Sequence, residues 1–174
     1  MTYPIPLSEV FRVKARFSRS VNVLADYADP SALSDYIITP LSRAVLRRIA
    51  QGLRPGSRSR SWSITGPYGT GKSACALFTA KILGLHAGSA AARDLLKSKD
   101  PDLHDELFGE IPGLADGGFF VVLTVGSREP LPLAIVQGLI AALRGRSAVS
   151  EAEPALLSEL QALRDLIRQG AVVA

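Results

Sequence analysis

The sequence predicts an α/β fold in which helices cover both faces of a parallel β-sheet. Two apolar runs are typical of buried parallel strands, residues 61–65 and residues 119–125. The second run, Phe-Phe-Val-Val-Leu-Thr-Val, is continuous, aromatic and β-branched. The predicted order is helix, strand, loop, helix, strand, helix and helix. This alternation is expected of a three-layer sandwich around a parallel sheet.

Five helices are predicted from apolar residues that recur at helical spacing, over residues 40–52, 72–83, 90–97, 131–143 and 151–169. Thr39 can cap the first of these helices, and Pro40 suits its first turn. Ser150 and Gly170 mark the start and the end of the last helix. Residues 1–35 are predicted to be irregular except for a short strand at 21–24, and residues 98–118 are predicted to be loops.

Composition limits the class of protein. The chain of 174 residues has room for one domain, and its apolar content of 47% is ordinary for a soluble protein. No apolar run reaches the roughly 20 residues needed to span a bilayer, and no secretory signal is recognised at the start. The single cysteine excludes an internal disulfide and a cysteine-based zinc site. We therefore expect a cytoplasmic protein without a membrane partner.

Charge divides the chain into a basic lead-in, residues 1–60, and a second part, residues 61–174. The lead-in contains ten Lys or Arg and four Asp or Glu, whereas the second part contains ten and twelve. The arginines of the lead-in are Arg12, Arg16, Arg19, Arg43, Arg47, Arg48, Arg54, Arg58 and Arg60. Such a segment either contacts nucleic acid or an acidic protein, or is a solvated basic face.

A glycine-rich loop between the first strand and the next helix predicts a phosphate site. The pattern Gly-x-x-x-x-Gly-Lys-Ser allows successive backbone amides to surround a phosphate, at the positive end of the following helix. Lysine then reaches the β- and γ-phosphates, and the hydroxyl of Ser73 is a ligand for Mg²⁺. We expect this loop to bind ATP and Mg²⁺ through Gly66, Pro67, Tyr68, Gly69, Thr70, Gly71, Lys72, Ser73 and Ala74.

The segment from Ile64 to Ser73 resembles the Walker A motif of AAA-type P-loop ATPases, and the helix at 40–52 resembles the element that covers the nucleotide base in those proteins. A looser resemblance links the runs 17–21 (Phe-Ser-Arg-Ser-Val) and 36–39 (Tyr-Ile-Ile-Thr) to large prokaryotic ATPases of defence gene clusters. The resemblance implies a P-loop NTPase fold. It also implies an ATPase that remodels nucleic acid or protein, with a homo-oligomer or a partner subunit.

The sequence departs from that family in one respect. A Walker B strand ends in Asp, usually followed by Glu, which hold Mg²⁺ and activate water. The run 119–125 ends instead in Thr-Val before Gly126. In the resembled family the Walker B strand comes one helix later, so 171–174 would be either its first residues or only a ragged end. The resemblance thus predicts an incomplete domain, the front part of a larger ATPase, with no catalytic residue assigned. The alternatives are a switch or scaffold that binds ATP without turnover and, less favoured, a small-molecule kinase.

Two residues after the second strand have two interpretations each. Glu129 is either a sensor of the γ-phosphate or a surface residue of the loop. Arg128 is either an arginine finger for a neighbouring subunit or another surface residue.

Residues around the glycine-rich loop are interpreted in the same way. Cys75 is either a reactive thiol or a small buried hydrophobe. We expect Tyr68 to be exposed at the lip of the site and Trp62 to pack against its own strand. His86 and His104 have no partners at metal-ligand spacing and are predicted to be surface residues.

Overall fold

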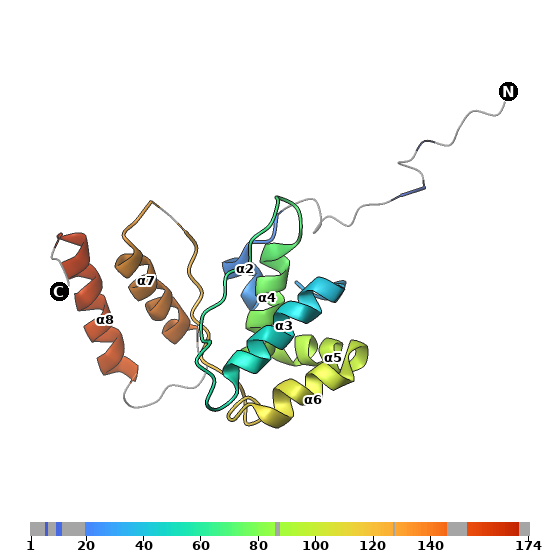
Figure 1. The fold of residues 1–174 in the computed structure, drawn as a ribbon. Coiled ribbons are helices and arrows are strands. Elements are labelled where there is room, and N and C mark those ends of the chain that lie inside the picture. The colour runs from blue at the N-terminus through green and yellow to red at the C-terminus, as the bar shows by residue number, and fades with distance from the viewer. Residues whose placement is uncertain are drawn as a thin grey trace.

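A computed structural model describes residues 6, 10–11, 20–85, 88–126, 128–145 and 153–170 (Figure 1). The helices of these residues are α2 (Val23–Ala28), α3 (Pro40–Leu53), α4 (Lys72–Leu83), α5 (Ser89–Lys99), α6 (Pro101–Glu110), α7 (Leu131–Arg144) and α8 (Glu153–Arg168). Arg12, Arg16, Arg19 and His86 lie outside the described residues, as do most of the run 17–21 and the predicted strand start at 171–174.

The predicted α/β fold is wrong, because the described part of the chain is all-helical and contains no β-strand. Residues 61–65 and 119–125 are extended, but neither run forms a ladder of hydrogen bonds. A parallel bridge joins Gly84 to Phe119, with the amide of Phe119 donating to the carbonyl of Leu83 at 2.7 Å. A strand requires a neighbour along its length, and a single bridge does not provide one. The three-layer P-loop sandwich is therefore not formed by these residues.

Local capping explains two further differences from the predicted elements. The run 21–24 is not a strand, because Asn22 accepts a hydrogen bond from the amide of Ala25 at 3.2 Å and starts α2. Helix α6 was not predicted, because Pro101 was interpreted as a loop residue. Pro101 occupies the first position of α6, where proline is favoured. Asp100 caps this helix by accepting a hydrogen bond from the amide of Leu103 at 3.3 Å.

The other predicted helices are confirmed within a few residues. Thr39 caps α3 by accepting from the amide of Ser42 at 3.1 Å, as its position before Pro40 predicts. The helix predicted at 72–83 is α4, and the one predicted at 131–143 is α7, which extends by one residue. The short helix predicted at 90–97 is α5, which is longer at both ends. The last predicted helix is α8, and Ser150 lies outside the described residues.

One hydrophobic core is shared by the basic lead-in and the rest of the chain. Its buried members are Leu33, Leu46, Ala50, Leu77, Phe78, Ile82, Ala92, Leu96, Leu103, Leu107, Ile111 and Leu114. Helix α4 packs against α2 and α5, while α6 packs against α5 and α3 (Figure 1). A division of the chain at residue 60 therefore passes through this core.

Ion pairs join α3 and the turn after it to α6. Arg43 pairs with Asp100 at 2.5 Å and Arg47 with Glu106 at 3.7 Å. Arg54 pairs with Glu106 at 3.1 Å and with Glu110 at 2.6 Å. Part of the positive charge of the lead-in is thus balanced inside the molecule by carboxylates of the second part.

Helices α7 and α8 form a hairpin beside the core (Figure 1). The extended run that leads into α7 packs against it at Gly138, where an added Cβ would lie 2.7 Å from Cγ2 of Thr124 and 3.0 Å from the carbonyl oxygen of Leu123. Among the described residues, no helix is both long and apolar enough to cross a membrane.

Candidate functional site

The glycine-rich loop stands at the end of the molecule, beyond the N-terminus of α4 (Figure 1). Gly69 and Gly71 have φ angles of 82° and 79°, in the left-handed region that other residues adopt at a cost of about 1–2 kcal/mol. No atom lies within 4 Å of a Cβ added at either position. Glycine is therefore needed here for the backbone conformation, and the space around the loop is open.

The N-terminus of α4 has no side-chain cap. Gly71 is its N-cap residue, and the first helical hydrogen bond runs from the amide of Cys75 to the carbonyl of Gly71 at 2.9 Å. The amides of Lys72, Ser73 and Ala74 precede that bond. Amides in this position carry the positive end of the helix dipole and are suited to binding an anion.

The side chain of Lys72 folds back over the loop. Its Nζ donates to the carbonyl oxygens of Gly66 at 2.8 Å and Pro67 at 2.5 Å. The hydroxyl of Thr70 also donates to the carbonyl of Pro67, at 2.9 Å. The ammonium group is thereby held across the loop, while the adjacent Ser73 is exposed in the first turn of α4. The structure thus places Gly66, Pro67, Tyr68, Gly69, Thr70, Gly71, Lys72, Ser73 and Ala74 in one loop and helix start.

Tyr68 is at the tip of the loop and is 93% exposed, as predicted for a residue at the lip of the site. Its hydroxyl lies 3.2 Å from the hydroxyl of Ser20, which comes from the lead-in. Trp62 does not pack within a strand. Instead its ring covers Gly52 at the end of α3, where a Cβ would collide with the indole.

Cys75 lies behind the loop and is buried, which confirms its interpretation as a small hydrophobe. Burial raises the pKa of its thiol, so the reactive thiolate is disfavoured. Burial also raises the pKa of the neighbouring Tyr36, to about 12, and the ring of Tyr36 lies 4.5 Å from that of Phe78. The first turns of α4 therefore pack against an apolar and aromatic surface.

The extended run 119–125 ends without a carboxylate. Thr124, Val125 and Gly126 are exposed and include no carboxylate. Arg128 and Glu129 are exposed in the loop before α7, which agrees with their interpretation as surface residues. His104 is only partly a surface residue. Its ring is 4.7 Å from that of Phe108, and its Nδ1 lies 3.0 Å from Asp105.

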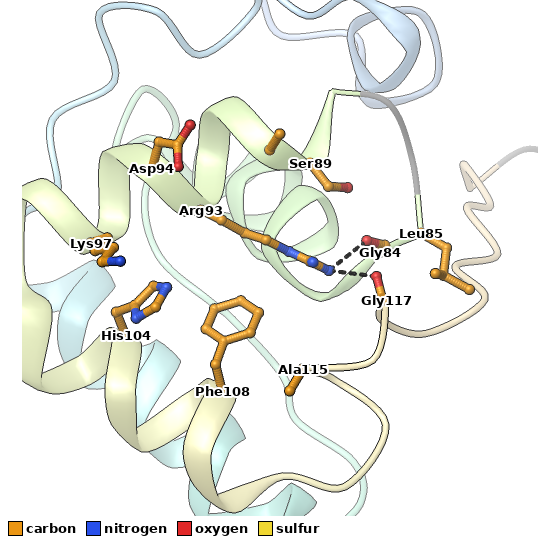
Figure 2. A pocket seen from close by; sticks show the side chains of 11 residues that line it. Gly84, Leu85, Ser89, Arg93, Asp94, Lys97, His104, Phe108, Ala115 and Gly117 are labelled. Carbon is orange, nitrogen blue, oxygen red and sulfur yellow. Dashed lines mark hydrogen bonds between the residues drawn. The ribbon is translucent and has the colours of Figure 1, made fainter.

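A pocket of about 700 Å³ lies at the opposite end of α4, and the sequence did not predict it (Figure 2). Helix α4 separates this pocket from the loop, and a helix of 12 residues is about 18 Å long. Arg93 forms one wall by donating to the carbonyls of Ile82 at 3.0 Å and of Gly84 and Gly117 at 2.9 Å. Its guanidinium also lies 5.0 Å from the centre of the Phe108 ring. Glycine is required beside this side chain, because a Cβ at Gly118 would lie 2.6 Å from Nη2 of Arg93. The adjacent glycines 117 and 118 are the one feature of the sequence that could have indicated this close approach.

The described residues contain no group of three or more His, Cys, Asp or Glu side chains that could hold a metal ion. A Mg²⁺ ion held by Ser73 and by phosphate oxygens does not require such a cluster, because Mg²⁺ keeps several waters. The residues present at the loop are compatible with that arrangement.

Fold and site together define a helical protein with a glycine-rich loop at an uncapped helix start. Comparisons with protein families, with curated proteins and with solved structures give no match.

Proposed function

We propose that the loop 66–73 binds a nucleoside triphosphate, ATP, together with Mg²⁺. The observation that carries this proposal is the convergence of Lys72 with the left-handed glycines on the uncapped start of α4. Helix-start amides and an ammonium group on the same short loop favour a compact polyanion. The Gly-x-x-x-x-Gly-Lys-Ser spacing supports a phosphate chain as that anion.

Each residue has a defined task in this proposal. The amides around Gly69, Gly71 and Lys72 would hold the β-phosphate. The ammonium of Lys72 would release the carbonyls of Gly66 and Pro67 and bind the β- and γ-phosphates instead. Ser73 would supply one oxygen ligand to Mg²⁺, and the ion would neutralise phosphate charge. No side chain caps the helix start, so no side chain of the protein competes for its amides.

We infer that this chain is the nucleotide-binding part of an ATPase that remodels nucleic acid or protein. The alternative is a switch that binds ATP without turnover. No apolar run of this sequence is followed by the Asp-Glu pair of a Walker B motif, which favours binding without turnover by the chain alone. A measurement of phosphate release from ATP distinguishes the ATPase from the switch. We expect the purified chain to release it at the rate of a Lys72→Ala variant, and faster release by the unmodified chain would contradict this expectation.

The binding proposal is tested by titrating the chain with a fluorescent ATP analogue in the presence of Mg²⁺. Lys72→Ala should weaken binding by about 100-fold, because a charge-assisted contact to two phosphates is lost. Lys97→Ala is the matched control, since it removes an exposed lysine near the other end of α4. Circular dichroism would establish that both variants keep their helices. Equal affinity of Lys72→Ala and the unmodified chain would remove the loop as the site.

A further inference from the structure

The ion pairs between α3 and α6 divide the six described arginines of the lead-in into two sets. Arg43, Arg47 and Arg54 are neutralised by carboxylates. Arg48, Arg58 and Arg60 are exposed and have no carboxylate partner among the described residues. Composition does not distinguish these six arginines. In the structure, those of the second set carry positive charge that no carboxylate of the described residues balances, so they are available to a partner.

The available arginines lie on two segments that meet at Gly52, α3 and the connection 57–62. Arg48 precedes Gly52 by four residues, so the two lie on the same side of α3. A Cβ at Gly52 would collide with both the indole of Trp62 and the carbonyl oxygen of Ser59. The connection 57–62 therefore folds back onto that side of α3, and it brings Arg58 and Arg60 with it.

The indole that meets Gly52 is not fully covered. Trp62 remains 37% exposed, although part of its ring rests on Gly52. A partly exposed aromatic ring on the same segments as three arginines combines a stacking surface with cations that match phosphate geometry. We refer to Arg48, Arg58, Arg60 and Trp62 as the Arg48–Trp62 face.

We propose that the Arg48–Trp62 face binds single-stranded nucleic acid. Its arginines would contact successive phosphates, and Trp62 would stack on a base, the combination that single-strand-binding proteins use without sequence preference. An acidic protein segment would satisfy the cations but would have no use for the exposed indole. This proposal goes beyond nucleotide binding at residues 66–73 and does not depend on it.

The experiment uses the only tryptophan of the chain as its probe. Single-stranded DNA of mixed sequence is titrated into the protein while the indole fluorescence is followed, at several salt concentrations. We expect saturable quenching. Each phosphate contact contributes about 0.7 to the slope of log K against log salt, so a variant without the three arginines should lower the slope by about 2.

Two variants of equal net charge make the result specific. Arg48→Gln, Arg58→Gln and Arg60→Gln are combined in the first. The second combines Lys97→Gln, Lys99→Gln and Arg168→Gln, which removes three exposed cations from α5 and α8. The first should lose binding by about 100-fold at low salt, whereas the second should bind like the unmodified chain. Equal losses in both variants would overturn the proposal, because only net charge would then matter.

Competition with polyglutamate separates nucleic acid from an acidic protein as the partner of this face. Polyglutamate that displaces the DNA at equal charge concentration would overturn the proposal in favour of an acidic protein partner. Binding of DNA without quenching would overturn the role of Trp62, and absence of binding would overturn the proposal itself. The Lys72→Ala variant should bind DNA normally, so failure of the phosphate loop and failure of this face are distinguishable.

Discussion

Arg93 donates from Nη2 to the carbonyl oxygen of Gly84 at 2.9 Å, and this bond closes the C-terminal end of α4. The same nitrogen donates to the carbonyl of Gly117 (Figure 2). The Nε atom donates to the carbonyl of Ile82. The last carbonyls of a helix have no partners within it, so they require groups from elsewhere. One side chain of α5 thus ties α4 to the segment that carries the bridge between Gly84 and Phe119.

Replacement of this guanidinium should destabilise the whole core. We expect Arg93→Met to lower the free energy of unfolding by about 3 kcal/mol, because three carbonyls lose a charged donor while the side chain keeps its length. Arg93→Lys should recover part of the loss, since one ammonium cannot reach all three oxygens in the same geometry. Urea unfolding followed by circular dichroism measures both. A loss below about 1 kcal/mol in the Met variant would contradict the proposed role of these bonds.

Gly71 should be more sensitive to alanine than a helical glycine. At a φ of 79° an alanine is strained by about 1–2 kcal/mol, even though no atom obstructs its Cβ. The control is Gly109→Ala, inside α6 and equally unobstructed, which should stabilise the protein by about 0.5–1 kcal/mol. Thermal unfolding of the two variants should therefore shift in opposite directions. Shifts of the same sign would argue against a left-handed Gly71.

Asp100 combines two contacts that can be separated. It caps α6 through the amide of Leu103 and pairs with Arg43, although it is 6% exposed. Asp100→Asn keeps an acceptor for the cap and loses the ion pair, whereas Asp100→Ala loses both. We expect the alanine variant to be about 1 kcal/mol less stable than the asparagine variant, the usual contribution of an N-cap. Chemical denaturation of both variants would measure the difference, and equal stabilities would show that the cap contributes nothing.

Alkaline pH should destabilise the protein through Tyr36. Burial raises the pKa of its hydroxyl from 10.0 to about 12, so the folded state holds a proton that the unfolded state loses. Stability is unaffected by this group below pH 10.0 and falls as the pH rises toward about 12. In Tyr36→Phe the decline over this range should be shallower. Urea midpoints of both proteins across the range test this, and identical slopes would exclude Tyr36 as the cause.

Helical order was predictable from the sequence because its signals are local. Caps such as Thr39, a proline at the first helical position and apolar residues at helical spacing act within one or two turns. Pro101 shows the weakness of this approach. A proline can begin a helix or end one. The capping residue Asp100 directly before Pro101 shows that this proline begins one.

The sheet could not be predicted in the same way, because a strand depends on a partner that is distant in the sequence. The run 119–125 has the composition of a buried strand, but composition does not supply a neighbour with free amides and carbonyls. The glycine-rich loop was located correctly from its spacing. The fold-back of Lys72, the clamp made by Arg93 and the ion pairs of α3 with α6 depend on tertiary contacts and were not predictable.

The contact of Lys72 with the carbonyls of Gly66 and Pro67 gives the loop a built-in competitor. Any anion that recruits the ammonium must first displace two oxygens of the protein itself, so the observed affinity is the intrinsic affinity reduced by the population of the released side chain. In the proposed site a ligand with a single phosphate would gain little from this exchange, whereas a triphosphate would replace both oxygens at once. The same contact that orders the loop would thus set a threshold of charge for what enters it.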